Sequence, residues 1–228
     1  MGAALGWGAL AASSLVIGAL LGVLRPWPTA LVGAVLAFGA GALISAVSFD
    51  LVEEGSRLGD PGTVGIGLAI GALTYFGLDH IIDRPGSSSG GTALALGAFL
   101  DGIPEQMVLG IGLATGEGVS VGLLVAIFVS NLPEAIGSAT DMQAAGRNPA
   151  VIRRLWIAVA VICTLATVGG YALADSASDN LRAIINGFAA GALLVMLIDS
   201  MIPEASKKTG RAAGLVTVLG FAVAFALS

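Results

Sequence analysis

The sequence predicts an all-α polytopic membrane protein with eight transmembrane helices in a 3+2+3 arrangement, an inverted repeat, and both termini outside. Three observations predict this fold class: an apolar composition, eight apolar runs between short polar breaks, and two similar segments far apart in the chain. Of the 228 residues, 56% are hydrophobic and 11% are charged. Soluble domains carry about 25% charged residues. The mean hydropathy of +0.95 therefore indicates a chain whose surroundings are membrane lipid.

The apolar runs have the length that membrane-spanning helices need, which is about 20 residues. The first run lacks the basic start and cleavage site of a secretory signal, so we expect it to be a retained helix. Within one transporter domain of residues 1–228, the helices are predicted at 3–24, 30–54, 61–83, 92–115, 119–142, 150–174, 181–205 and 211–227. Turn-forming residues separate them, as in Arg25-Pro26-Trp27-Pro28, Gly59-Asp60-Pro61-Gly62, Arg84-Pro85-Gly86-Ser87 and Arg147-Asn148-Pro149.

Basic residues sort between the two sides that eight alternating spans define. One side carries Arg25, Arg84, Arg147, Arg153, Arg154, Lys207, Lys208 and Arg211, whereas the other carries Arg57 and Arg182. Basic loops stay preferentially in the cytoplasm. We therefore expect the basic side to be cytoplasmic and the termini to be external, with a bacterial inner membrane as the location.

The second and seventh spans resemble each other at an offset of 150 positions. The matching positions are Phe38, Ala40, Gly41, Ala42, Leu43 and Glu54, which correspond to Phe188, Ala190, Gly191, Ala192, Leu193 and Glu204. These spans cross in opposite directions, as expected for an inverted repeat with a binding site near the midplane. Chance matching of Gly/Ala-rich helices is the alternative explanation.

Two proline–glutamate motifs lie in the middle of the fourth and fifth spans. They are Asp101-Gly102-Ile103-Pro104-Glu105 and Ser130-Asn131-Leu132-Pro133-Glu134. A carboxylate at bilayer depth is costly enough to indicate function, and proline frees a carbonyl oxygen one turn earlier. An oxygen-rich set suits hard or borderline divalent cations. We therefore predict metal binding by Asp101, Glu105, Ser130, Asn131 and Glu134; the alternative is that these side chains only hydrogen-bond between helices.

Further polar residues are candidates for an ion pathway. They are Asp50, Glu54, Gln106, Met107, Asp141, Asp199 and Glu204. Acids at helix ends attract cations but are equally often just solvated. Methionine in an apolar helix more often serves packing, and Glu204 has Lys207 and Lys208 nearby for a surface ion pair.

At these motifs the chain resembles the Zrt/Irt-like (ZIP) family of divalent metal transporters. The resemblance covers essentially the whole chain and implies eight helices, external termini and a cation substrate of the zinc, manganese or iron class. It also implies inward transport by elevator-like sliding of two helix bundles, often within a homodimer. Position by position, Glu105 and Glu134 match metal-binding glutamates of the family, and Asn131 matches a position that is often Asn or Asp.

This sequence departs from the family pattern in ways that bear on metal choice. Asp101 and Ser130 replace the motif histidines, and Gly102 stands where an asparagine ligand is common. The sixth span has no acid before Asp175. Fewer imidazole ligands lower the preference for zinc, which favours manganese, iron(II) or magnesium in relative terms.

Two other classes of function remain open at the level of the sequence. One is a metal sensor or scaffold that no longer transports. The other is an intramembrane hydrolase, disfavoured because the chain has no His-Glu-x-x-His motif and no nucleophile beside the acids other than Ser130. We expect no enzymatic activity, no organic cofactor and no nucleic-acid partner.

Overall fold

The computed structural model describes residues 1–25, 27–82, 92–114 and 121–227, and leaves out the side chains of residues 82, 92–101, 175 and 176. Throughout that part of the chain the regular elements are helices. They are α1 (Gly2–Leu24), α2 (Thr29–Ala46), the π-helical η1 (Val47–Glu53), α3 (Glu54–Leu58), α4 (Pro61–Ile82), α5 (Thr92–Ala114), α6 (Val121–Ala144), α7 (Pro149–Ser176), α8 (Asp179–Met196), the π-helical η2 (Leu197–Met201), α9 (Ile202–Thr209) and α10 (Ala212–Leu227).

Six helices of the described part are long and apolar enough to cross a membrane. They are Gly2–Leu24, Thr29–Leu58, Pro61–Ile81, Val121–Ala144, Pro149–Ala174 and Asp179–Thr209. Two of these join an α-helix, a π-helical segment and a second α-helix into one rod. The other two predicted spans correspond to α5, which carries the first proline–glutamate motif, and to α10, which has 16 residues. The structure thus supports a polytopic helical membrane protein, and the count of eight spans stays a prediction.

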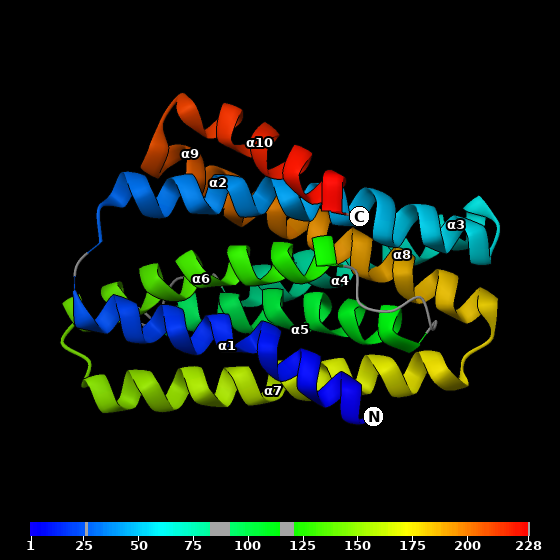
Figure 1. Cartoon of the computed structure of the whole chain (residues 1–228), viewed down its shortest axis with the longest axis horizontal. Helices are drawn as coiled ribbons and strands as arrows, with labels where there is room; N and C mark the ends of the chain where they lie inside the picture. The colour runs from blue at the N-terminus through cyan, green and yellow to red at the C-terminus, as the bar shows by residue number, and fades with distance from the viewer. Residues whose placement is uncertain (26, 83–91, 115–120, 228) are drawn as a thin grey trace.

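The helices pack into two bundles, and each bundle combines helices that are distant from one another in the sequence. In the first, α1 packs against α6 and α7, and α5 packs against α7. In the second, α4 packs against α8, and α10 packs against α2. Figure 1 shows α2, α8, α9 and α10 in the upper layer and α1, α5, α6 and α7 below them. Contacts of α2 with α6 and of α5 with α8 join the two bundles.

The two long helices Thr29–Leu58 and Asp179–Thr209 change to π-helical geometry at matching positions. The π-helical segments begin at Val47 and at Leu197, which are 150 positions apart, the offset of the sequence repeat. Single π-helical turns within α-helices occur often at functional sites. The shared change of geometry therefore supports the internal repeat independently of Gly/Ala composition.

Glycine contacts repeat with the same symmetry. A Cβ at Gly220 of α10 would collide with the carbonyl oxygen of Phe38 on α2, and a Cβ at Gly71 of α4 would collide with that of Phe188 on α8. Phe38 and Phe188 are matching positions of the repeat. Small residues allow such close backbone approach, which drives helix association in lipid.

The basic ends of the helices gather at one end of the molecule. The connection after α1, which begins at Arg25, the start of α7 and the end of α9 lie at the left in Figure 1, whereas the turns after α3 and after α7 lie at the right. Arg57 belongs to the last turn of α3, and Arg182 to the first turns of α8. This distribution agrees with the predicted sidedness, while the orientation in a particular membrane stays a prediction.

Asp60 organises the start of α4 from the turn that precedes it. Its carboxylate accepts hydrogen bonds from the Thr63 hydroxyl at 2.6 Å, the Gly62 amide at 2.9 Å and the Thr63 amide at 3.2 Å. These bonds, that of the Thr63 side chain first, lower the pKa of Asp60 below its ordinary value.

We expect Asp60→Ala to lower the thermal unfolding midpoint modestly at pH 7, because α4 loses its cap. A carboxyl with a lowered pKa stabilises the fold above its unfolded-state pKa of about 3.9 and loses that contribution as the pH falls through the folded-state value. The difference between wild type and variant should therefore shrink below about pH 4. Thermal melts of detergent-solubilised protein across this range measure it; a pH-independent difference would contradict the assignment.

Candidate functional site

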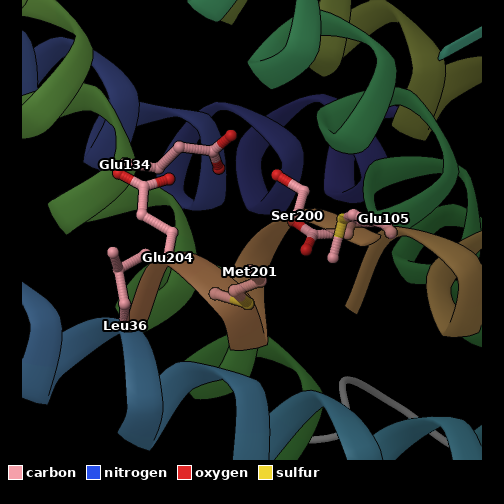
Figure 2. A pocket seen from close by; sticks show the side chains of 7 residues that line it. Leu36, Glu105, Glu134, Ser200, Met201 and Glu204 are labelled. Carbon is pink, nitrogen blue, oxygen red and sulfur yellow. The ribbon is translucent and has the colours of Figure 1, made fainter. Parts of the chain in front are cut away.

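A pocket that includes three glutamates in its lining lies at the boundary between the two bundles. It is lined by Leu36 of α2, Glu105 of α5, Glu134 of α6, Met196 of α8, Ser200 and Met201 of η2, and Glu204 of α9. The first bundle thus contributes two carboxylates and the second contributes one. Figure 2 shows Glu105 and Glu134 reaching into the pocket from opposite sides with Ser200 between them, and Glu204 beside Glu134.

Glu105 is held in a nearly solvent-free position. Its side chain is 1% exposed, and its Oε1 lies 3.5 Å from the Ser130 hydroxyl of α6. Helix α5 continues through Pro104, which precedes this glutamate. The Ser130 hydroxyl also lies 3.1 Å from the Ile127 carbonyl, which is its nearer acceptor, so its contact with Glu105 is a long and weak link between α5 and α6.

Close contact between α2 and α6 fixes the second side of the pocket. A Cβ on Gly39 of α2 would come within 2.8 Å of the Ser130 Cα. Glu134 lies one helical turn after Ser130 on the same face of α6. The missing side chain at Gly39 therefore brings α2 close to the face of α6 that carries Glu134.

Glu204 combines two roles that the sequence analysis treated as alternatives. It lines the pocket with Glu105 and Glu134. It also forms an ion pair with Lys208, with 2.5 Å between Nζ and Oε1. The sequence indicated a pathway position and a surface pair as alternatives; in the structure one carboxylate lines the pocket and also forms the ion pair, and its place in an ion pathway stays a prediction.

The other predicted ligands occupy different surroundings. The Asp101 side chain lies outside the described part of the structure. Asn131 is 1% exposed but does not line the pocket, and neither its Oδ1 nor its Nδ2 has a hydrogen-bond partner among the described residues. An unsatisfied buried amide is costly. The Asn131 amide can therefore still donate and accept hydrogen bonds with an additional group.

Gln106 contacts α7 through its side chain, and neither Gln106 nor Met107 lines the pocket. The Gln106 Oε1 accepts a hydrogen bond of 2.6 Å from the Thr167 hydroxyl. The backbone of Met107 packs against Gly170. Both residues therefore join α5 to α7 within the first bundle.

The remaining pathway candidates lie away from the pocket lining. Asp141 and Asp199 are exposed, whereas Asp50 and Glu54 are half-buried. Glu54 lies 3.7 Å from Arg57 in an ion pair. Asp199 precedes the pocket residue Ser200, and successive helical positions point about 100° apart, so the neighbour of a lining residue need not face the pocket.

Within the described residues, no group of three or more His, Cys, Asp or Glu side chains is close enough to hold a metal ion. The three glutamates line a common pocket but do not form a closed ligand cage.

Four lining residues escaped the sequence analysis: Leu36, Met196, Ser200 and Met201. A signal for two of them was present, because Met196 and Ser200 precede Glu204 by eight and four positions and so share its helical face. No comparable signal marked Leu36, which reaches the pocket from another helix.

The fold and this pocket define a helical, polytopic membrane protein with acidic residues at the boundary of two bundles. No family model matches the chain. The chain is 30% identical over 181 residues to a protein of Arabidopsis thaliana that bears the name "putative zinc transporter". The match covers 74% of this chain and 29% of the plant protein, so the chain spans less than a third of that relative.

Proposed function

We propose that the protein transports a divalent metal cation across the membrane and is a divergent ZIP-family transporter. The observation that carries the proposal is the convergence of Glu105, Glu134 and Glu204 on one pocket between two bundles. Acids inside membrane spans mark ion pathways. Similarity to a plant protein named as a zinc transporter supports the same class of substrate.

The position of the pocket suggests how transport proceeds. Two carboxylates belong to the bundle of α5 and α6, and one belongs to the bundle of α8 and α9. Sliding of one bundle past the other would change the distance of Glu204 from the other two acids. The cation would then be held in one arrangement and released in another, as in alternating access. The resemblance to the ZIP family implies that this transport runs toward the cytoplasm.

The pocket lining also bears on metal choice. Carboxylate and hydroxyl oxygens suit hard cations, whereas the Met196 and Met201 thioethers suit softer ones. This mixed lining favours zinc, iron(II) and manganese over magnesium, which departs from the relative preference for magnesium that the missing histidines alone indicate.

Uptake into proteoliposomes tests the proposal. Purified protein should carry labelled Zn²⁺ into vesicles, and unlabelled zinc, iron(II) or manganese should compete better than magnesium. Metal-dependent thermal stabilisation without any flux would favour a metal sensor over a transporter. The absence of both effects would refute metal binding.

A further inference from the structure

Lys208 places a positive charge at the edge of the acidic pocket. Its Nζ lies 2.5 Å from the Glu204 Oε1, and the Lys208 side chain is only 19% exposed while that of Glu204 is 35% exposed. Because Glu204 lines the pocket, this ion pair neutralises one of the three pocket carboxylates.

Two glycines on different bundles shape the position of Lys208. A Cβ at Gly33 of α2 would come within 2.5 Å of the Lys208 Cβ, so the lysine stem packs directly on the α2 backbone. A Cβ at Gly137 of α6 would come within 3.2 Å of the Nζ, so the charged tip rests on the helix that carries Glu134. The lysine therefore extends from the second bundle to the surface of the first.

A matching pair elsewhere in the molecule lacks these features. At the corresponding place in the repeat, Arg57 pairs with Glu53 and Glu54, and its side chain is 66% exposed. Exposed pairs spaced by one helical turn contribute little. Lys207, the repeat equivalent of Arg57, is exposed as well. Lys208 differs because it is largely covered and its partner belongs to the pocket.

We propose that Lys208 is a tethered competing cation, which occupies Glu204 when the pocket holds no metal and promotes metal release by reclaiming that carboxylate. This inference rests on the proposed function. A divalent cation and an ammonium group repel each other at short range, so both cannot be bound favourably at one carboxylate. When no metal is bound, Lys208 stabilises the pocket, because it neutralises one carboxylate in a cluster of acids that repel one another.

The rate of metal release tests the proposal. Protein in nanodiscs is loaded with Zn²⁺ and mixed with excess chelator, and the dissociation rate is followed by stopped flow. Lys208→Gln should slow release by about tenfold, a difference that corresponds to about 1.4 kcal/mol. Lys207→Gln, one position away on the same helix, should leave release unchanged, and Lys208→Arg should keep fast release because it keeps the charge.

A second measurement uses wild-type protein, so it does not depend on whether a variant folds. Saturating Zn²⁺ should increase acylation of Lys208 by an amine-reactive reagent relative to Lys207, since the metal displaces the ammonium from Glu204; peptide mass spectrometry measures both sites. If wild-type protein binds zinc but Lys208→Gln releases it as fast as Lys207→Gln, or metal leaves Lys208 acylation unchanged, Lys208 is only an ion pair and the inference falls. If wild-type protein binds no divalent metal, the proposed function fails as well.

Discussion

We expect Glu105→Gln to reduce zinc uptake into proteoliposomes by more than about 100-fold, because loss of a residue that only supports a metal ligand already costs about 10–100-fold. Glu105 is 1% exposed and lines the pocket between the bundles. Glutamine keeps the size of the side chain and can still accept a hydrogen bond from Ser130. The loss would therefore report the missing charge and not a cavity.

A matched control is available on a surface helix turn. Glu53 is 49% exposed and pairs with Arg57 at 2.6 Å, so Glu53→Gln removes the same charge from a place outside the pocket. Its uptake should equal that of the wild type. Uptake by Glu105→Gln within a fewfold of the control would show that this acid is structural, and the proposed transport site would have to be abandoned.

The second large effect is expected at the glycines where helices touch. Gly71→Ala should lower the free energy of unfolding by about 1–3 kcal/mol, the usual cost of overpacking. The new methyl group would collide with the Phe188 carbonyl oxygen on α8. Backbone atoms cannot rotate away as a side chain can, so α4 and α8 would have to separate.

The same helix supplies the control for this substitution. A Cβ added at Gly65 of α4 would have no atom of a neighbouring helix within 4 Å among the described residues. Gly65→Ala should be neutral or slightly stabilising, since alanine favours a helix more than glycine does. Thermal melts in detergent compare the two variants directly. Equal midpoints for Gly71→Ala and Gly65→Ala would mean that the close approach of α4 and α8 is not required for stability.

Much of the helical arrangement follows from local sequence signals. Apolar runs and turn residues predicted helices whose ends lie within four residues of those in the structure, as for 150–174 against Pro149–Ser176. There the Asn148 side chain caps the helix by accepting a bond of 2.8 Å from the Ala150 amide. Such contacts are made by residues adjacent in the chain, so they can be recognised without knowing the rest of the fold.

The sequence by itself determined that Glu105 and Glu134 are acids placed deep in apolar helices, because hydropathy and spacing are properties of the chain alone. Only the tertiary structure decided which neighbours they meet. Gln106 follows Glu105 but faces Thr167 on α7, and the Lys208 Nζ lies against Gly137 of α6. The helical period determines which residues share one face of a helix. Which helix packs against that face depends on how closely the backbones of helices distant in sequence can approach each other.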